Sequence, residues 1–224
     1  MSRHFDTELK DLKDGLMAMA AQVEEMIDLT VAVMTKRSDA LAEHVMDLDR
    51  KVDEKEVVLD QACIDLLGLR APFATDLRLL ASSLKIIPQL ERIGDHCKNI
   101  SRRALILNRQ RQVLNPEYFE QIGQAVRGMV KDSVDAFLKG DAELAHRVIQ
   151  SDDIVDDLHL KIFGELLRQM IQDPLCIERA SHLIIVNKNF ERIADHATNV
   201  AEEVLYILEG VNVKHPYLRE GSAD

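Results

Sequence analysis

The sequence predicts an all-α protein made of two tandem antiparallel three-helix bundles that are related by internal duplication. The first observation is a repeat: residues 91–95 (Glu-Arg-Ile-Gly-Asp) return 100 positions later as residues 191–195 (Glu-Arg-Ile-Ala-Asp). Such self-similarity indicates two copies of one structural unit. The second is the spacing of apolar residues in alternating steps of three and four, which is typical of amphipathic helices. The third is composition: nine Gly, five Pro and 4% aromatic residues favour an aliphatic helical core over a turn-rich β-fold.

Three long helical patterns occupy the first half. The first covers residues 5–36 and ends in basic residues, which suit a helix C-terminus. Ser38 is placed to cap the second helix, which reaches about Gly68. Pro72 suits the opening of the third. Because short connections make neighbouring helices antiparallel, residues 1–110 are predicted to form the first bundle.

The second half repeats this arrangement after a linker, residues 108–115, that is rich in Arg and Gln. Its boundary signals are Asn115-Pro116 at the start of the fourth helix, Gly140 at its end, Asp141 as cap of the fifth, Asp173-Pro174 before the sixth and Gly210 after it. Residues 113–210 are therefore predicted to form the second bundle, and residues 211–224 a C-terminal tail.

Both copies of the repeat carry two carboxylates four residues apart. Since each residue of a helix turns by ~100°, Glu91 and Asp95 project from the same side, as do Glu191 and Asp195. Like charges at this spacing cost a helix roughly 0.2–0.5 kcal/mol. A bound multivalent cation would remove that cost, so the spacing points to a metal site.

Each half has a second acidic pair on the preceding helix, Asp49 with Asp53 and Asp152 with Asp156. These pairs lie about 90° from the apolar stripe of their helix, where a carboxylate can meet one from the next helix. Two metal sites are predicted, one formed by Asp49, Asp53, Glu91 and Asp95 and the other by Asp152, Asp156, Glu191 and Asp195. Oxygen ligands suit magnesium, manganese, calcium or iron, and a nearby histidine broadens the choice to zinc.

Further side chains are candidates to support these sites from behind. They are Asn99, Asn199, Glu202 and His159, the last at the position that Glu56 has in the first half. Lys98 and Arg102 face the first acidic stripe where Thr198 and Glu202 face the second, so the second site is expected to bind cations more tightly. His96 and His196 point ~100° away from the preceding Asp, which favours a solvated or interhelical role over ligation.

The net charge of −11 disfavours binding to nucleic acid or to an anionic membrane surface. Three widely spaced cysteines indicate buried reduced thiols and hence a reducing compartment. No apolar run approaches the ~18 residues of a membrane span, and the first residues lack the apolar region of a signal peptide. A cytoplasmic location is therefore expected.

The chain resembles the PhoU family of phosphate-transport regulators over about residues 5–215. The resemblance is carried by residues 90–95 (Leu-Glu-Arg-Ile-Gly-Asp), residues 190–200 (Phe-Glu-Arg-Ile-Ala-Asp-His-Ala-Thr-Asn-Val), the upstream acidic pairs and residues 74–78 (Ala-Thr-Asp-Leu-Arg). It implies a PhoU-like all-α fold, multinuclear metal clusters on the Asp/Glu-x-x-x-Asp motifs, and a negative regulator rather than an enzyme. It also implies partners: the ATPase and membrane subunits of a phosphate ABC transporter, and a PhoR-type sensor histidine kinase.

The resemblance further implies a protein that keeps phosphate-starvation genes off when phosphate is plentiful. A homodimer is expected, located in the cytoplasm and held at the inner face of the membrane only through its partners.

Two other functions fit an acidic helical bundle. A carboxylate-bridged di-iron enzyme needs a Glu-x-x-His from each of two helices, and the sequence offers one, Glu143 with His146. A metal-free scaffold for a basic partner is the other, because Arg92 and Arg192 could neutralise carboxylates on the adjacent helix. Such exposed ion pairs are worth ~0–1 kcal/mol each.

Overall fold

The computed structural model describes residues 2–70 and 74–209, and all of its long elements are α-helices. They are α1 (Ser2–Lys36), α2 (Asp39–Arg70), α3 (Ala74–Leu107), α4 (Glu117–Lys139), α5 (Ala142–Gln172) and α6 (Ile177–Glu209), with a short 3₁₀ turn, η1 (Pro174–Cys176), before α6. The predicted all-α fold is confirmed. Pro72, Gly210 and the tail 211–224 lie outside the described residues.

Several predicted helix boundaries are present with the expected chemistry. Ser38 Oγ accepts the Leu41 amide hydrogen at 3.4 Å, and Asp141 Oδ1 accepts that of Leu144 at 2.9 Å. Gly140 ends α4 with a φ of 65°, a backbone conformation that glycine adopts without steric cost. Asn115 Oδ1 accepts from the Glu117 amide at 3.2 Å, although the N-cap of α4 lies one residue later, at Pro116.

Two boundary predictions are wrong in detail. Gly68 does not end α2, which continues to Arg70, because a glycine inside a helix costs only about 1 kcal/mol and does not force an end. Asp173 does not cap α6 directly. Its side chain accepts from Leu175 N at 3.1 Å and so caps the 3₁₀ turn, after which α6 begins at Ile177.

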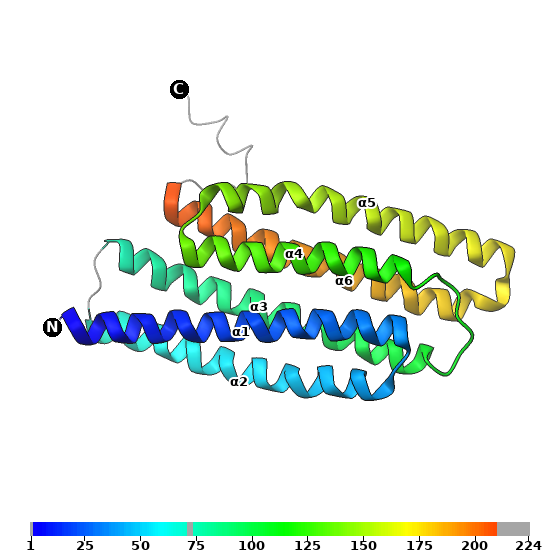
Figure 1. Ribbon diagram of the computed structural model, residues 1–224, viewed down its shortest axis with the longest axis horizontal. Coiled ribbons are helices and arrows are strands. Elements are labelled where there is room, and N and C mark those ends of the chain that lie inside the picture. Colours follow the sequence, from blue (N-terminus) through cyan, green and yellow to red (C-terminus); the bar gives the residue numbers. More distant parts are fainter. Residues whose placement is uncertain (1, 71–73, 210–224) are drawn as a thin grey trace, which may run out of the picture.

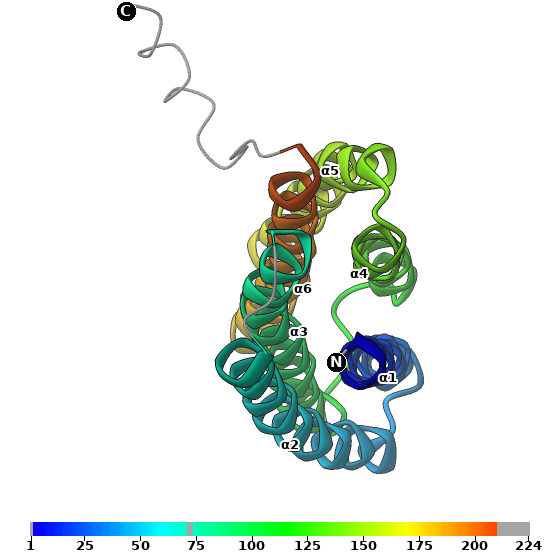
Figure 2. The ribbon, with the colours of Figure 1, turned by 90° about the vertical axis from the view of Figure 1, so that its left-hand side faces the viewer.

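The six helices form two three-helix bundles that lie side by side. Figure 1 shows that successive helices run antiparallel. Figure 2 shows α2, α3, α6 and α5 in one curved layer, with α1 and α4 against its concave side. The bundles meet through α3 with α6 and through α1 with α4. This arrangement brings the two copies of the repeated motif, on α3 and α6, next to each other.

The core runs without interruption from one bundle to the other. Buried residues of both halves belong to one apolar cluster. Within the second half, Phe190 of α6 is stacked at 6.4 Å on Phe119 of α4. The approach of α1 to α4 is close: a Cβ added to Gly123 would lie 2.1 Å from Val31 Cγ2. A larger residue at this position would therefore require the Val31 side chain or one of the two helices to move.

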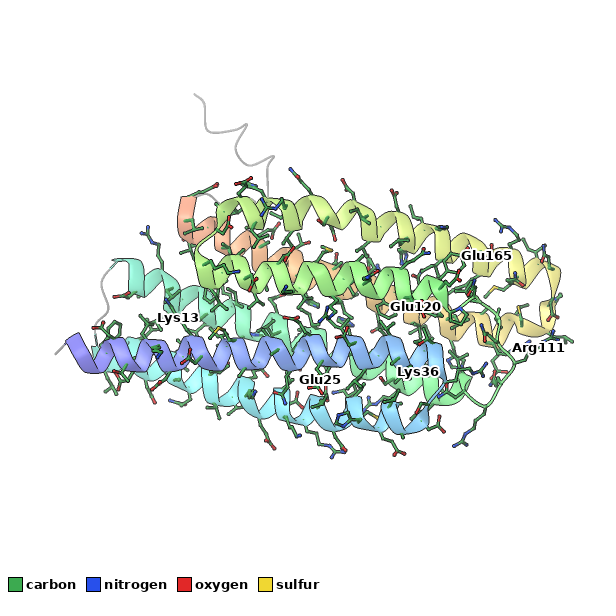
Figure 3. All side chains as sticks on the ribbon, in the orientation of Figure 1. Lys13, Glu25, Lys36, Arg111, Glu120 and Glu165 are labelled. Carbon is green, nitrogen blue, oxygen red and sulfur yellow. The ribbon has the colours of Figure 1, made fainter. Side chains whose placement is uncertain are left out.

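The connection between the halves is fixed to the first bundle by Arg37. This residue ends α1 with a φ of 54°, and its guanidinium donates to the carbonyl oxygens of Leu107 and Gln110. Charged side chains such as Glu25, Lys36, Arg111 and Glu120 are exposed on the outside of the bundles (Figure 3). Within residues 2–70 and 74–209, no helix has the length and apolarity that a membrane crossing requires.

Candidate metal centres

The predicted acidic pairs lie on α2 and α3 in the first half and on α5 and α6 in the second. Helix α2 packs against α3, and α5 packs against α6. We call Asp49, Asp53, Glu56, Glu91 and Asp95 the first acidic cluster, and Asp152, Asp156, Glu191 and Asp195 the second acidic cluster. All eight predicted ligands belong to these two groups.

In the first acidic cluster, carboxylates from both helices interact. Burial raises the pKa of Glu91 to about 7, and the negative charges of Asp95, Glu56 and Asp53 add to the effect. Burial also raises the pKa of Asp49, a residue that is only 3% exposed. Glu56 was not among the predicted ligands, although it follows Asp53 on the same side of α2.

The first acidic cluster contains its own cation. The Lys98 ammonium donates to Asp49 Oδ2 at 2.6 Å and lies 2.5 Å from Asp95 Oδ1, and so joins α2 to α3. These two contacts raise the pKa of Lys98 against the opposing effect of its burial. The expectation that Lys98 faces the first acidic stripe is confirmed.

In the second acidic cluster, burial raises the pKa of Asp152 to about 6, and the charges of Asp156 and Asp195 raise it further. The pKa of Asp195 is also raised, by burial and then by Glu191. The charges that act on Asp152 of α5 thus include those of Asp195 and Glu191 of α6, the carboxylates that the sequence groups with it.

The basic side chains beside the second acidic cluster come from α6 itself. Lys188 lies 2.5 Å from Glu191 Oε2, and Arg192 Nη1 donates to Asp195 Oδ2 at 2.8 Å. Both are about half exposed. Thr198 stands where the first half has Lys98, and its buried hydroxyl has no hydrogen-bond partner.

The donor atoms fit a hard or intermediate cation, because each cluster offers carboxylate oxygens whose crowding is relieved by positive charge. Asp60 Oδ1, one turn beyond Glu56, is buried without a hydrogen-bond partner. In the described part of the chain, no three Asp, Glu, His or Cys side chains stand ready to hold one ion together. Binding would therefore require rotation of carboxylate side chains, a common change on ligand binding.

The predicted supporting residues have varied surroundings. Asn99 lines a cleft with Arg102 and Arg103, and Asn199 Nδ2 donates to Gln89 Oε1 of α3 at 3.2 Å. His159 has a buried Nδ1 without a partner, and Glu202 is half-buried on α6.

The one Glu-x-x-His spacing is on the surface. Glu143 pairs with Arg147, and His146 with Glu209 at 3.3 Å, and both Glu143 and His146 are exposed. A di-iron site would need these side chains in a bundle interior.

The fold and the two clusters define a class: a duplicated three-helix bundle with acidic motifs at equivalent places in each half. The sequence profile described as "PhoU domain" matches this chain twice, at residues 16–104 and 119–204. The chain therefore belongs to the PhoU family.

Relatives cover nearly the whole chain. The phosphate-specific transport system accessory protein PhoU homolog of Aquifex aeolicus is 39% identical over 95% of this chain and 96% of its own length. The homolog of Pseudomonas putida is 35% identical over 100% of this chain and 88% of its own. Relatives are thus named as accessory proteins of phosphate transport, not as enzymes.

Solved structures agree with the fold. The crystal structure of PhoU from Pseudomonas aeruginosa superposes with a TM-score of 0.89 at 36% identity, covering 92% of this chain and all of that one. PhoU from Streptococcus pneumoniae, described as a phosphate transport system regulatory protein, gives a TM-score of 0.87 at 25% identity, covering 94% and 99%.

Proposed function

We propose that this protein is a metal-dependent negative regulator of phosphate uptake and of phosphate-starvation gene expression. The observation that carries the proposal is the duplicated acidic cluster, in which burial and crowding raise the pKa of Glu91 to about 7 and of Asp152 to about 6. A raised pKa means that the ionised carboxylates are unfavourable where they stand. A multivalent cation would suit them, because it would remove their mutual repulsion. Iron, manganese, magnesium and zinc are the candidate ions.

The proposed partners are the ATPase and membrane subunits of a phosphate ABC transporter and a PhoR-type sensor histidine kinase. Membership of the family, together with relatives named as accessory to phosphate-specific transport, supports the first partner. The protein would act in the cytoplasm, as a homodimer, and bridge transporter to kinase. Occupancy of the acidic clusters would set which surfaces are available to them.

The test uses a bacterial host that lacks its own PhoU and carries a reporter for a phosphate-starvation promoter. The wild-type chain should silence the reporter in phosphate-rich medium. The double variant Asp152→Asn, Asp195→Asn should leave the reporter active, while the surface variant Glu120→Gln should silence it normally. A double variant that silences as well as wild type, at equal protein level, would refute a role for the second acidic cluster in regulation.

A metal-free acidic scaffold is a second candidate, and one observation favours it. The Lys98 ammonium already pairs with both Asp49 and Asp95, so part of the negative charge of the first acidic cluster is compensated without a metal ion. The two functions differ in thermal denaturation. A scaffold would show the same melting temperature with Mn²⁺ and with chelator, whereas a metal-dependent regulator would melt at a higher temperature with Mn²⁺.

A further inference from the structure

The seam between α3 and α6 carries a symmetric group of polar side chains. His96 Nδ1 lies 2.8 Å from Asn189 Oδ1, and His196 Nδ1 lies 2.8 Å from Gln89 Oε1. Residues 89 and 189, like 96 and 196, are 100 positions apart. The two contacts are therefore the same contact, made twice by antiparallel copies of one repeat.

Neighbouring hydrogen bonds fix which ring nitrogen carries hydrogen. Asn189 Nδ2 donates to the Ile185 carbonyl at 2.7 Å, so its oxygen is the atom that faces His96. Gln89 Oε1 accepts from Asn199 Nδ2 as well as from His196. An amide oxygen only accepts, so both histidines donate through Nδ1. In the neutral rings, both Nε2 atoms then carry a lone pair.

These two Nε2 atoms face each other. They are 3.3 Å apart, whereas the ring centroids are 5.3 Å apart, so the nitrogens lie on the facing edges of the rings. Two acceptors without a hydrogen between them repel, and 3.3 Å is longer than an ordinary N–H hydrogen bond of about 2.7–3.2 Å. A tetrahedral metal ion with bonds of about 2.0–2.1 Å to nitrogen would space two such ligands about 3.3–3.4 Å apart.

We infer that His96 and His196 form a binding site for a divalent transition-metal ion such as Zn²⁺, Ni²⁺ or Cu²⁺, ligated through both Nε2 atoms. Nitrogen ligands select this class of ion, in contrast to the oxygen ligands of the acidic clusters. Asn189 and Gln89 orient the rings from behind, as partners of metal-bound histidines commonly do. The site goes beyond the proposed function, since it needs neither acidic cluster and takes one ligand from each half.

The surroundings tolerate a cation and give it access to water. The positive charges of Arg92 and Arg192 act on His196, and each arginine has a carboxylate on its own helix: Glu91 at 3.9 Å and Asp195 at 2.8 Å. His196 also borders an open cleft of about 320 Å³. Water entering from this cleft would supply the remaining ligands.

The test is electron paramagnetic resonance of the untagged, full-length protein with one equivalent of Cu²⁺, in excess Mg²⁺ to occupy the acidic clusters. The expected spectrum shows hyperfine coupling to two imidazole nitrogens. His96→Gln and His196→Gln should each remove one nitrogen and weaken Zn²⁺ binding at this site at least tenfold. The glutamine amide can still donate to Asn189 Oδ1 or Gln89 Oε1, which preserves the seam.

Two controls separate this site from others. His44→Gln, an exposed histidine of α2, should leave the two-nitrogen spectrum unchanged, as should the pair Asp53→Asn, Asp156→Asn, which alters both acidic clusters. Oxygen-only ligation in the wild type would overturn the inference without the need for any variant. So would a two-nitrogen spectrum that persists in both histidine variants.

Discussion

The two acidic clusters share their carboxylate positions but differ in the cation that accompanies them. In the first, the Lys98 side chain is 18% exposed and bridges Asp49 to Asp95. In the second, Thr198 occupies that position, and the basic residues Lys188 and Arg192 are 46% and 51% exposed. One half thus holds a shielded ammonium between its helices, and the other has only solvated basic groups beside it.

The difference shows how a duplicated site can diverge without losing its acidic residues. A shielded charge interacts strongly because little water screens it, whereas exposed ion pairs contribute about 0–1 kcal/mol. An incoming metal ion must displace the shielded Lys98 in the first cluster, but only the half-exposed Lys188 and Arg192 in the second. We therefore expect the second cluster to be the stronger metal site, and the following experiments test that comparison.

The largest effect is expected from ligand removal. Asp195→Ala should weaken tight Mn²⁺ binding by more than the ~10–100-fold that loss of a supporting residue costs, because a ligand itself is lost. Asp95→Ala should leave the tight site intact. Isothermal titration of both variants checks this. Equal loss in the two variants would mean that the clusters are equivalent.

Exchange of the internal cation should reverse the comparison. Lys98→Thr leaves the buried Asp49 carboxylate unpaired and should destabilise the metal-free protein by ~1–3 kcal/mol. The same variant should strengthen Mn²⁺ binding in the first half by about tenfold, or ~1.4 kcal/mol. Lys51→Thr, at an exposed site of α2, is the control for loss of a lysine. Denaturation with chelator and with Mn²⁺ measures both effects. Lys98→Thr must lower the stability of the metal-free protein and increase the stabilisation that Mn²⁺ provides.

The two acidic clusters should affect the pH dependence of the protein's stability over different pH ranges. The folded state raises the pKa of Glu91 from 4.5 to about 7 and that of Asp152 from 3.8 to about 6. In these ranges the folded protein binds more protons than the unfolded chain, so stability without metal falls as pH rises. Glu91→Gln should flatten the curve up to about pH 7, and Asp152→Asn only up to about pH 6.

Urea denaturation with chelator, at several values between about pH 4.5 and about pH 7.5, separates the two windows. Stability that rises over this range and is unaffected by either variant would show that these carboxyl groups are not held protonated by the fold.

The smallest effect is expected from the residues that cap the N-terminus of the second helix of each half, Asp141 and Ser38. Asp141→Ala should cost ~1 kcal/mol, since the carboxylate accepts the Leu144 amide at 2.9 Å. Ser38→Ala should cost less, because the equivalent distance to Leu41 is 3.4 Å. Thermal denaturation of both variants compares them. A larger loss from Ser38→Ala would show that the distance does not reflect the strength of the cap.

Local sequence signals predicted the helices well, because capping and periodicity act within a few residues. Asp141, Ser38 and Gly140 each have the predicted role. The acidic clusters were predictable for the same reason, since a four-residue spacing places two carboxylates on one side of a helix. Glu56 was missed as a member because its nearness to Glu91 depends on the offset between α2 and α3.

Contacts between the halves could not be predicted from the repeat. Periodicity identifies the apolar side of each helix but not the helix it packs against. The facing of His96 and His196 requires both the antiparallel direction and the register of α3 on α6. The sequence predicts a solvated or interhelical role for these residues, and the structure places the two rings against each other between α3 and α6, a pairing that the sequence did not predict.

Gly123 has a consequence for how the molecule melts. A methyl group at Gly123 would overlap the Val31 side chain, so α4 packs closely on α1. The apolar core also continues through both bundles, and the two halves therefore share one interior. The duplicated chain is therefore expected to fold as one cooperative unit and not as two independent domains. Heat or denaturant should therefore remove both halves in a single transition.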